Sequence, residues 1–407
     1  MIPEGWQETT LGHLTKIVTS GSRDWAQHYS KTGAKFIRMT NLARDGIYLS
    51  LDKLKFVNVK NDSSDGKRTQ LKNGDILISI TAELGKIAWI PENIGEAYIN
   101  QHTALVRLNK KHSESKFIAY LLSSRSMNNT INRLNDAGAK AGLNLPTIKS
   151  IPINLPPLPE QIKIANILTT WDKAVETVEK LIDNSRAQKQ ALMRQLLTGT
   201  KRLPGFSEEW YSVVIQKMGR VVSGGTPDTN IDSYWDEDFS WATPTDITAL
   251  KSRFIEKTRR KISLAGVNNS SAHLLPEGSI LVCTRATIGH LAIAKNEITT
   301  NQGFKSLTPS SKYDSDFIYY LFKYHKHIFI RYACGSTFLE ISKKDFSKLS
   351  FTIPGLKEQK EIARRLNSED DAIRQFEVYR DYLVTEKKAL MQQLLSGKRR
   401  VKIDTAA

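Results

Sequence analysis

The stretch "ALMRQLLTGTKR" at residues 191–202 returns almost unchanged as "ALMQQLLSGKRR" at residues 389–400. Each copy closes with Gly and basic residues, which is typical of a helix C-terminus, because Gly accepts the left-handed cap and cations face the helix dipole. At a constant offset of 198 residues, segments 155–202 and 353–400 align without a gap and are identical at about 20 of 48 positions. Solenoid repeats are far shorter, so the pattern indicates a duplicated half.

Each duplicated segment is predicted to form one long helix. The segments open with "LPPLPEQ" and "IPGLKEQ", in which Pro starts the helix and Glu lies near its positive end. Apolar residues then alternate by four and three, a heptad frame that requires a partner helix, and the other copy is the obvious partner. An amphipathic helix on a local core is the alternative. The predicted helix-pairing residues are Ile164, Leu168, Trp171, Val175, Val178, Ile182, Leu192 and Leu196 in the first copy, and Ile362, Leu366, Ile373, Phe376, Leu383, Leu390 and Leu394 in the second.

The segments in front of the two helices are also related, though more loosely. "GDILISITAELGKIA" from Gly74 aligns with "GSILVCTRATIGHLA" from Gly278, and "INQHTALVRL" from Ile99 aligns with "TNQGFKSLTP" from Thr300. Both segments mix short β-branched runs with helical stretches and Gly, Pro and Asn turns. We therefore predict an α+β protein with two mixed α/β domains. The predicted parts are a first domain at 1–154, a central helix at 155–202, a second domain at 203–352, and a C-terminal helix and tail at 353–407.

Chain connectivity favours an antiparallel coiled coil for the two helices. A helix over residues 160–198 spans roughly 58 Å at ~1.5 Å per residue. In a parallel pair the second domain would have to carry the chain back over that whole length. An antiparallel pair only needs a domain with adjacent ends. The prediction is a pseudo-two-fold duplication, with one domain at each end of the helices and the two chain termini close together.

The charge balance points to a polyanionic partner. The chain has 59 Lys and Arg against 42 Asp and Glu, a net charge of +17, spread along its whole length. Such a spread favours nucleic acid bound along an extended surface, although a basic protein with no such role is the alternative. The start "MIPEGWQETT" has no secretion signal, and no apolar run approaches bilayer length. Cys283 and Cys334 form no CxxC pair, so we expect a cytoplasmic protein with no disulfide framework and no membrane partner.

Sequence motifs for catalysis or metal binding are missing. There is no GxxxxGK[ST] phosphate loop and no GxGxxG dinucleotide pattern. "TPDTN" at 226–230 begins like a nuclease motif but lacks the E-x-K that should follow, and the pair His325 and His327 has no companion carboxylates. The recurrence of Glu160 as Glu358 is most simply structural. We therefore expect no enzyme and no metal site.

The ordered set of these segments resembles the specificity subunits of type I restriction-modification enzymes. The resemblance is carried by "IPINLPPLPEQIKIANIL" (151–168), "LLTGTKRLPGF" (196–206), "SGGTPDTNIDSYWDEDFSWATPTDI" (223–247) and "ILVCTRATIGHLAI" (280–293), and it covers essentially the whole chain. It implies a non-catalytic subunit whose two target-recognition domains each read one half of a gapped, asymmetric site in double-stranded DNA. The helices would set the spacing and dock modification subunits.

The resemblance also implies the partners. Two modification (methyltransferase) subunits would bring S-adenosylmethionine for adenine methylation, and restriction/translocase subunits would bring ATP and Mg. This chain itself would bind no cofactor. The alternatives are an orphan or fused DNA-recognition module for another methyltransferase or nuclease, and a coiled-coil scaffold that does not bind DNA.

The residues that contact DNA should lie in loops of the two domains. Arg and Lys suit guanine, Asn and Gln suit adenine, and Ser and Thr suit phosphate or base. For Trp25 and Trp241, core packing is the alternative role, and for Gln101 and Gln302 it is fixing a shared turn. The candidates are Ser22, Arg23, Trp25, Arg38, Thr40, Asn41, Lys86, Gln101 and His102 in the first domain, and Thr226, Trp241, Thr243, Thr245, Asp246, Arg285, Thr287, Gln302 and Lys305 in the second.

Overall fold

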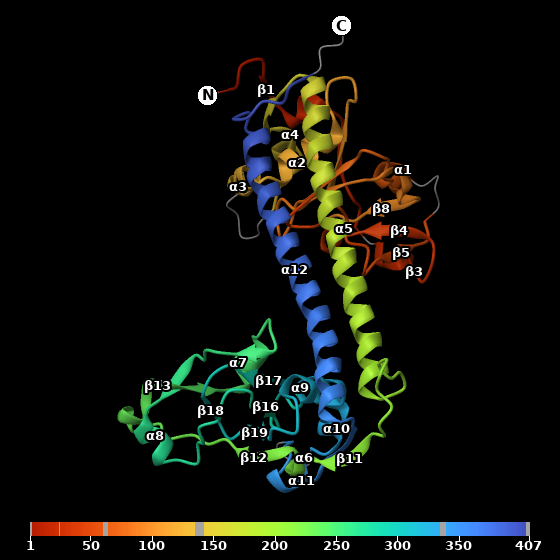
Figure 1. Ribbon diagram of the computed structural model, residues 1–407. Helices are drawn as coiled ribbons and strands as arrows, with labels where there is room; N and C mark the ends of the chain where they lie inside the picture. The colour runs from red at the N-terminus through yellow and green to blue at the C-terminus, as the bar shows by residue number, and fades with distance from the viewer. Residues whose placement is uncertain (1, 24, 60–63, 135–141, 334–338, 404–407) are drawn as a thin grey trace. The chain divides into compact units, whose positions relative to one another are not determined.

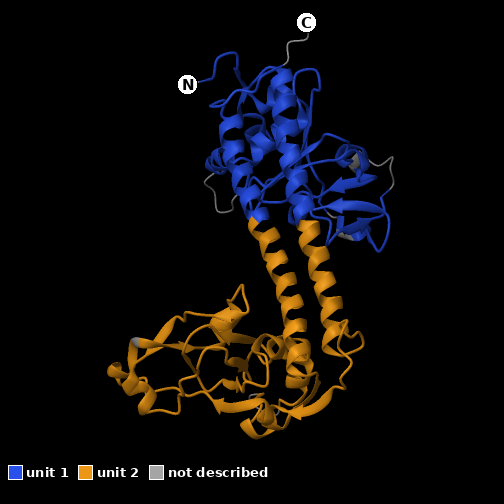
Figure 2. Cartoon of the chain, in the orientation of Figure 1, with its two compact units in different colours: residues 1–178, 379–407 blue, residues 179–378 orange. Residues whose placement is uncertain are grey.

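The computed structural model describes residues 2–23, 25–59, 64–134, 142–333 and 339–403. The chain divides into two compact units (Figure 2): unit 1 comprises residues 1–178 and 379–407, and unit 2 comprises residues 179–378. Two helices of 40 residues each, α5 (Leu158–Leu197) and α12 (Leu356–Leu395), cross this division. Each unit therefore contains one mixed α/β domain and a part of both long helices.

The described strands of unit 1 form three sheets. The strand orders are β1-β10, β2-β9-β6-β7 and β3-β5-β4-β8, in which β4 and β8 pair in parallel and the other paired strands are antiparallel. The strands are β1 (Gln7–Thr10), β2 (Thr15–Ser20), β3 (Tyr29–Ser30), β4 (Ala34–Ile37), β5 (Lys55–Val57), β6 (Ile76–Ser79), β7 (Ile87–Trp89), β8 (Ala97–Ile99), β9 (Thr103–Leu108) and β10 (Pro152–Leu155). The helices of the domain are α1 (Ser64–Thr69), α2 (Ser115–Ser123), α3 (Arg125–Arg133) and α4 (Leu145–Lys149).

The described strands of unit 2 repeat this plan and also form three sheets. Their orders are β11-β20, β12-β19-β16-β17-β14 and β15-β13-β18, and the parallel pair β13–β18 corresponds to β4–β8. The strands are β11 (Tyr211–Val214), β12 (Gly219–Ser223), β13 (Trp235–Ala242), β14 (Phe254–Ile255), β15 (Arg260–Ile262), β16 (Ile280–Cys283), β17 (Leu291–Ala294), β18 (Ile298–Thr300), β19 (Phe304–Pro309) and β20 (Ser350–Ile353). The helices are α6 (Ile215–Met218), α7 (Pro244–Thr248), α8 (Leu264–Asn268), α9 (Ser315–Tyr324), α10 (Lys326–Arg331) and α11 (Lys343–Lys348).

Within each unit the two long helices run antiparallel, as predicted (Figure 1). In unit 1, Glu160 of α5 pairs with Arg400, and further along α5 Asp172 pairs with Lys387, so one residue number rises as the other falls. In unit 2 the same inverse order joins Lys189 to Asp370 and Arg202 to Glu358.

The heptad frame faces inward in both units. All residues of the predicted pairing set are buried or half-buried, including Ile164 and Leu168 in unit 1 and Ile362 and Leu366 in unit 2. These four side chains also belong to the domain cores, since Ile164 and Leu168 pack with α2 and Ile362 and Leu366 pack with α9. The frame therefore serves helix pairing and domain attachment together.

Both long helices end as their sequences predict. Gly199 and Gly397 follow the last helical turns with φ of 69° and 70°, the left-handed conformation that glycine adopts without steric cost. Beyond the second cap, Arg400 Nη1 donates to the Glu4 carbonyl at 2.6 Å. The two ends of the chain thus meet in unit 1, as expected.

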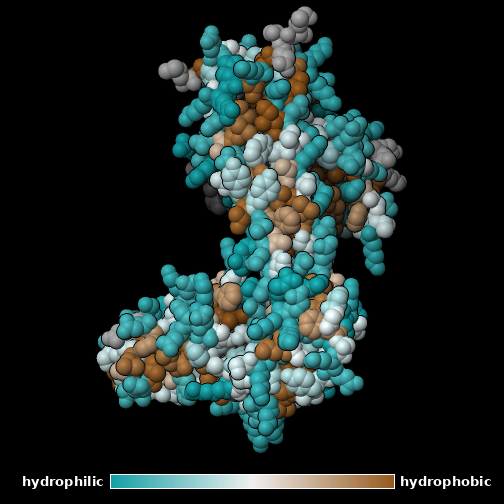
Figure 3. All heavy atoms as spheres, in the orientation of Figure 1, coloured by the Kyte–Doolittle hydropathy of each residue, from teal (hydrophilic) through white to brown (hydrophobic). Residues whose placement is uncertain are grey.

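The surface is mixed in character. Hydrophilic residues cover much of the face of each unit drawn in Figure 3, with hydrophobic residues gathered in patches. Among the helices of the described ranges, none is long and apolar enough to cross a bilayer.

Candidate nucleic-acid interface

Five loops meet at one edge of the domain in unit 1. This first loop cluster comprises residues 20–23, 38–41, 81–86, 100–103 and 142–144. Backbone hydrogen bonds join its parts: Gly21 N donates to Thr103 O at 3.4 Å, Ile80 N donates to His102 O at 3.1 Å, and Leu143 N donates to Ile80 O at 2.9 Å. The 38–41 turn joins the cluster because β4 pairs in parallel with β8, so both strands end at this edge.

The domain in unit 2 builds the same arrangement. Its second loop cluster comprises residues 223–228, 243–246, 285–290, 301–304 and 339–341. Gly225 N donates to Thr300 O at 2.9 Å, Asn301 N donates to Ala242 O at 3.0 Å, and Ile341 N donates to Thr284 O at 3.1 Å. Most of the sequence-predicted candidates in each domain lie in one of these two clusters.

Close backbone packing explains the glycines of "SGS" and "SGG". A Cβ on Gly21 would lie 2.1 Å from the Asn100 carbonyl carbon, and one on Gly224 would lie 1.9 Å from the Asn301 carbonyl oxygen. Any side chain there would force the loops apart, because atoms do not approach so closely. Glycine is therefore required where the first loop crosses the turn after β8 or β18.

The 38–41 and 243–246 turns are each stabilised by the side chain of their last residue, which accepts hydrogen bonds from the first. Asn41 Oδ1 accepts from Arg38 N at 3.0 Å, and Asp246 Oδ2 accepts from Thr243 N at 2.8 Å and from Thr243 Oγ1 at 2.6 Å. Asn41 and Asp246 are buried, so they shape their turns. Thr245 is exposed within its turn, and Thr40 is exposed in the matching position.

The two candidate tryptophans lie in hydrophobic cores. Trp25 packs on Phe36 and Tyr98 with ring centroids 4.9 and 5.5 Å away. Trp241 packs edge-on against Trp235 and donates its indole N–H to Gly225 O at 2.9 Å. Each tryptophan is 5% exposed, a position that fits the packing alternative rather than contact with a base.

The Asn-Gln turns differ in their side-chain partners. In unit 1, His102 Nδ1 lies 2.8 Å from Thr81 Oγ1, while the neighbouring Gln101 side chain is half-buried. In unit 2, Thr226 Oγ1 donates to the amide oxygen of exposed Gln302. Asn100 and Asn301 accept backbone or hydroxyl hydrogen bonds inside their own turns, which gives them the shared structural role.

The remaining candidates include several charged side chains. Lys86 forms an ion pair with Glu83, and Arg23 is exposed. Ser22 accepts a hydrogen bond from Arg68, which also donates to Ser20 O at 2.6 Å. Thr287 is half-buried in the 285–290 turn.

Three residues of this region were not among the sequence-predicted candidates. Arg68 anchors the 20–22 loop, and Glu340 pairs with both Arg285 and Lys305. Arg260 lies 3.6 Å from the Trp235 ring centroid, a cation–π contact. Glu340 occupies the place that Gly142 has in unit 1, and its partners Arg285 and Lys305 are distant from it in sequence.

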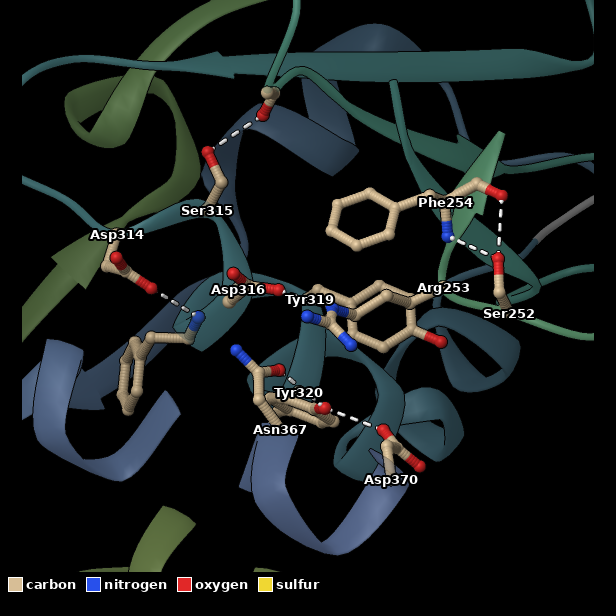
Figure 4. Close-up of polar contacts among 12 residues, drawn as sticks. Ser252, Arg253, Phe254, Asp314, Ser315, Asp316, Tyr319, Tyr320, Asn367 and Asp370 are labelled. Carbon is tan, nitrogen blue, oxygen red and sulfur yellow. Dashed lines mark hydrogen bonds and ion pairs between the residues drawn. The ribbon is translucent and has the colours of Figure 1, made fainter. Parts of the chain in front are cut away.

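A polar network attaches the domain of unit 2 to both long helices (Figure 4). The Tyr320 hydroxyl of α9 lies 2.6 Å from Asp370 Oδ2 and 2.8 Å from Asn367 Oδ1 on α12. Asp370 also pairs with Lys189 of α5. Burial raises the pKa of Tyr320 and lowers the pKa of Lys189. Burial alone would raise the pKa of Asp370, but hydrogen bonds from Lys189 and Tyr320 bring it below its ordinary value.

Unit 1 contains the same network at equivalent positions. The Tyr120 hydroxyl of α2 donates to Asp172 Oδ2 at 2.5 Å, and Asp172 pairs with Lys387 of α12. Both lysines lie over the tyrosine rings, with Nζ 5.5 Å from the Tyr120 centroid and 4.9 Å from that of Tyr320. Each domain is thus joined to both helices by one Tyr–Asp–Lys triad.

A second repeated contact joins the segment that follows each long helix to the first turn of the other long helix. Arg400 donates from Nε and Nη2 to the two oxygens of Glu160 at 2.7 and 2.8 Å, and Arg202 does the same to Glu358 at 2.9 and 2.7 Å. Both carboxylates are buried. This geometry gives the recurring glutamates the structural role expected from the sequence.

The described residues hold no group of three or more His, Cys, Asp or Glu side chains suited to a metal ion. Cys283 is a buried free thiol whose pKa burial raises to about 12, so it is not a reactive thiolate. Cys334 lies outside the described residues.

Comparisons with known proteins agree with this architecture. A family profile described as "Type I restriction modification DNA specificity domain" matches residues 3–184 and 207–377. The chain is 28% identical, over 98% of its length and 95% of the relative's, to the putative type I restriction enzyme MjaX specificity subunit of Methanocaldococcus jannaschii. The match to the MjaIX specificity subunit of the same organism is 37% identical and covers 41% of this chain and 39% of that one.

A solved structure described as "Structural basis underlying complex assembly and conformational transition of the type I R-M system" contains a chain with the same fold. The TM-score is 0.62 at 19% sequence identity, over 98% of this chain and 100% of the other.

Proposed function

We propose how this chain acts from the premise that it belongs to the type I restriction-modification DNA specificity family, to which the matches over residues 3–184 and 207–377 assign it. The family is that of the DNA-recognition subunit, and the relatives carry the same name. The chain recognises DNA for a type I restriction-modification complex. Its two loop clusters each read one half of a gapped site.

The observation that carries this proposal is one loop scaffold built twice with different side chains. The second cluster places Arg285 and Gly303 where the first has Thr81 and His102. Similar scaffolds with different hydrogen-bonding groups suit two different half-sites, since base edges are distinguished by donor and acceptor patterns. The net charge of +17 adds sequence-independent attraction to phosphates.

The helices set the separation of the half-sites in this proposal. The Tyr–Asp–Lys triads hold each domain to both helices, and the Arg–Glu pairs fix the helix ends. The repeated helical surface docks two modification subunits, one for each copy, because a duplicated surface offers two equivalent sites.

Chemistry belongs to the partners in this proposal. Modification subunits bring S-adenosylmethionine and methylate adenines, and restriction subunits bring ATP and Mg for translocation and cleavage. The chain itself binds no cofactor and works in the cytoplasm, with the DNA that it reads.

A selection experiment tests the proposal. The chain assembled with its modification subunits is incubated with a random duplex library at moderate salt, and bound DNA is sequenced. The expected result is one motif in two unequal parts with a fixed gap. A scaffold that does not bind DNA would return no enrichment, even at low salt where phosphate contacts are strongest.

A further inference from the structure

The turn after β6 and after β16 carries an unusual backbone conformation in both domains. Ala82 and Ala286 both have φ of 58°, a left-handed value that costs energy for any residue with a side chain. The residue before each alanine forms an isolated bridge, Thr81 to Gly142 and Arg285 to Glu340. The same strained turn therefore presents Thr81 in one domain and Arg285 in the other.

The side chains around this position differ completely between the domains. In unit 1, Thr81 contacts His102 at 2.8 Å. In unit 2, Arg285 Nε lies 3.3 Å from Glu340 Oε2, and Lys305 Nζ donates to Glu340 Oε1 at 3.1 Å. One carboxylate therefore bridges two cations in the second cluster.

The three charged groups differ in exposure, and this assigns their roles. The Lys305 side chain is 6% exposed, whereas those of Glu340 and Arg285 are 32% and 41% exposed. Lys305 is too buried to reach DNA, so its charge acts on Glu340. Arg285 faces Glu340 through Nε, and its terminal amino groups have no hydrogen-bond partner within the described part of the chain. The two terminal N–H donors of the planar guanidinium match the acceptors O6 and N7 of guanine.

On the basis of the proposed function, we propose that Arg285 reads a guanine in the half-site of the second domain. Glu340, whose carboxylate also pairs with Lys305, is the positioning residue that orients the Arg285 guanidinium. The first domain has Thr81 and His102 in this place and presents no guanidinium at this position. The two half-sites consequently differ at this position.

The test uses the chain assembled with its modification subunits and duplexes that carry each base pair, in turn, at every position of the selected motif. Arg285→Ala should lose about 5- to 150-fold discrimination for guanine at one position and leave all others unchanged. Arg285→Lys should retain only part of the discrimination for guanine, because a single ammonium cannot make the bidentate contact. The double variant Arg285→Ala/Glu340→Gln, which keeps an amide oxygen as the acceptor for buried Lys305, should give the same single-position loss.

Glu340→Gln separates positioning from a merely structural role. It should relax discrimination at the same position as Arg285→Ala, with the same salt dependence as the wild type. The matched control is Glu256→Gln, which breaks a comparable pair with Lys295, 3.1 Å apart, outside the loop cluster. The control should leave every position unchanged.

Three outcomes are decisive. If Arg285→Ala leaves every position of an intact wild-type motif unchanged, the guanine contact is wrong. If Glu340→Gln weakens binding to all duplexes alike, its role is structural and the positioning claim is wrong. If the wild-type complex shows no motif at all, the proposed function itself fails.

Discussion

Lys189 and Asp370 form an ion pair between α5 and α12, and Lys387 and Asp172 form the same pair with the helices exchanged. Each aspartate also accepts a hydrogen bond from a tyrosine of the neighbouring domain, Tyr320 or Tyr120. An unpaired buried charge is strongly unfavourable, so each triad favours one register of the helices over others. The two duplicated halves thus share a triad that fixes the register of α5 and α12.

Replacing the buried lysine should destabilise unit 2. Lys189→Met leaves Asp370 without its cation, and removing one partner of a buried pair costs roughly 3–5 kcal/mol. Because the Asp370 side chain keeps 26% exposure, solvent reduces the expected loss to about 2–3 kcal/mol. Denaturant unfolding and amide hydrogen exchange in α9 measure it.

Two controls sharpen that prediction. Lys173→Met removes an exposed lysine from the same helix and should change stability little. Lys189→Leu/Asp370→Leu should recover most of the loss, because no charge is left unpaired and Tyr320 keeps Asn367 as an acceptor. A double variant as unstable as Lys189→Met would argue that packing, not charge, is responsible.

Both truncation of Arg400 and its replacement by lysine should destabilise the protein through the Arg400–Glu160 pair. Arg400→Lys loses the bidentate geometry to a carboxylate that is buried, so we expect most of the destabilisation of Arg400→Ala, about 2 kcal/mol. Arg399→Lys, one residue earlier, is the matched control. Equal thermal midpoints for Arg400→Lys and the wild type would show that the fork is unimportant.

A methyl group on Gly224 should damage the second loop cluster. The added Cβ would lie 1.9 Å from Asn301 O, so the loop must move away from the Asn-Gln turn. We expect DNA affinity of the assembled complex to fall at least about tenfold, with loss confined to one half of the motif. Thr229→Ala, at an exposed site just beyond this loop, should bind normally. Unaltered affinity of Gly224→Ala would remove the 223–228 loop from the interface.

Stability should fall with acidification through His325. Burial, with neighbouring His327 adding to it, lowers the pKa of His325 from 6.5 to about 4. Between these values the unfolded chain binds a proton that the native chain does not, so stability decreases as pH falls from 6.5 toward 4. His325→Phe should flatten this slope, whereas the exposed His273→Gln should not. Urea midpoints across that range measure it, and an unchanged slope in His325→Phe would contradict the assignment.

The helices and their direction were predictable because their signals are periodic and repeated. Leu168 and Leu366 lie in the heptad frame, and Gly199 and Gly397 end it. The frame also passes through polar residues, and Lys189 lies in it seven residues after Ile182. The partner of Lys189 was not predictable, because the pair spans 181 residues of sequence and depends on how α5 and α12 pack.

The sequence predicted that these residues lie in loops, but it did not predict their individual roles. The spacing of Thr243 and Asp246 is that of a capping box, a local signal that could have indicated a structural role. Nothing local distinguishes the buried Trp241 from an exposed one, or connects Glu340 with Arg285. Those relationships arise from strand pairing across the domain, which one sequence does not encode at short range.

The adenine-methylation profile of the host genome, compared with and without this gene, tests the central claim most directly. The account predicts that one gapped, two-part, non-palindromic motif loses methylation when the gene is removed and regains it on complementation. An unchanged profile in cells that contain the modification subunits would contradict the claim that this chain directs methylation to its DNA site.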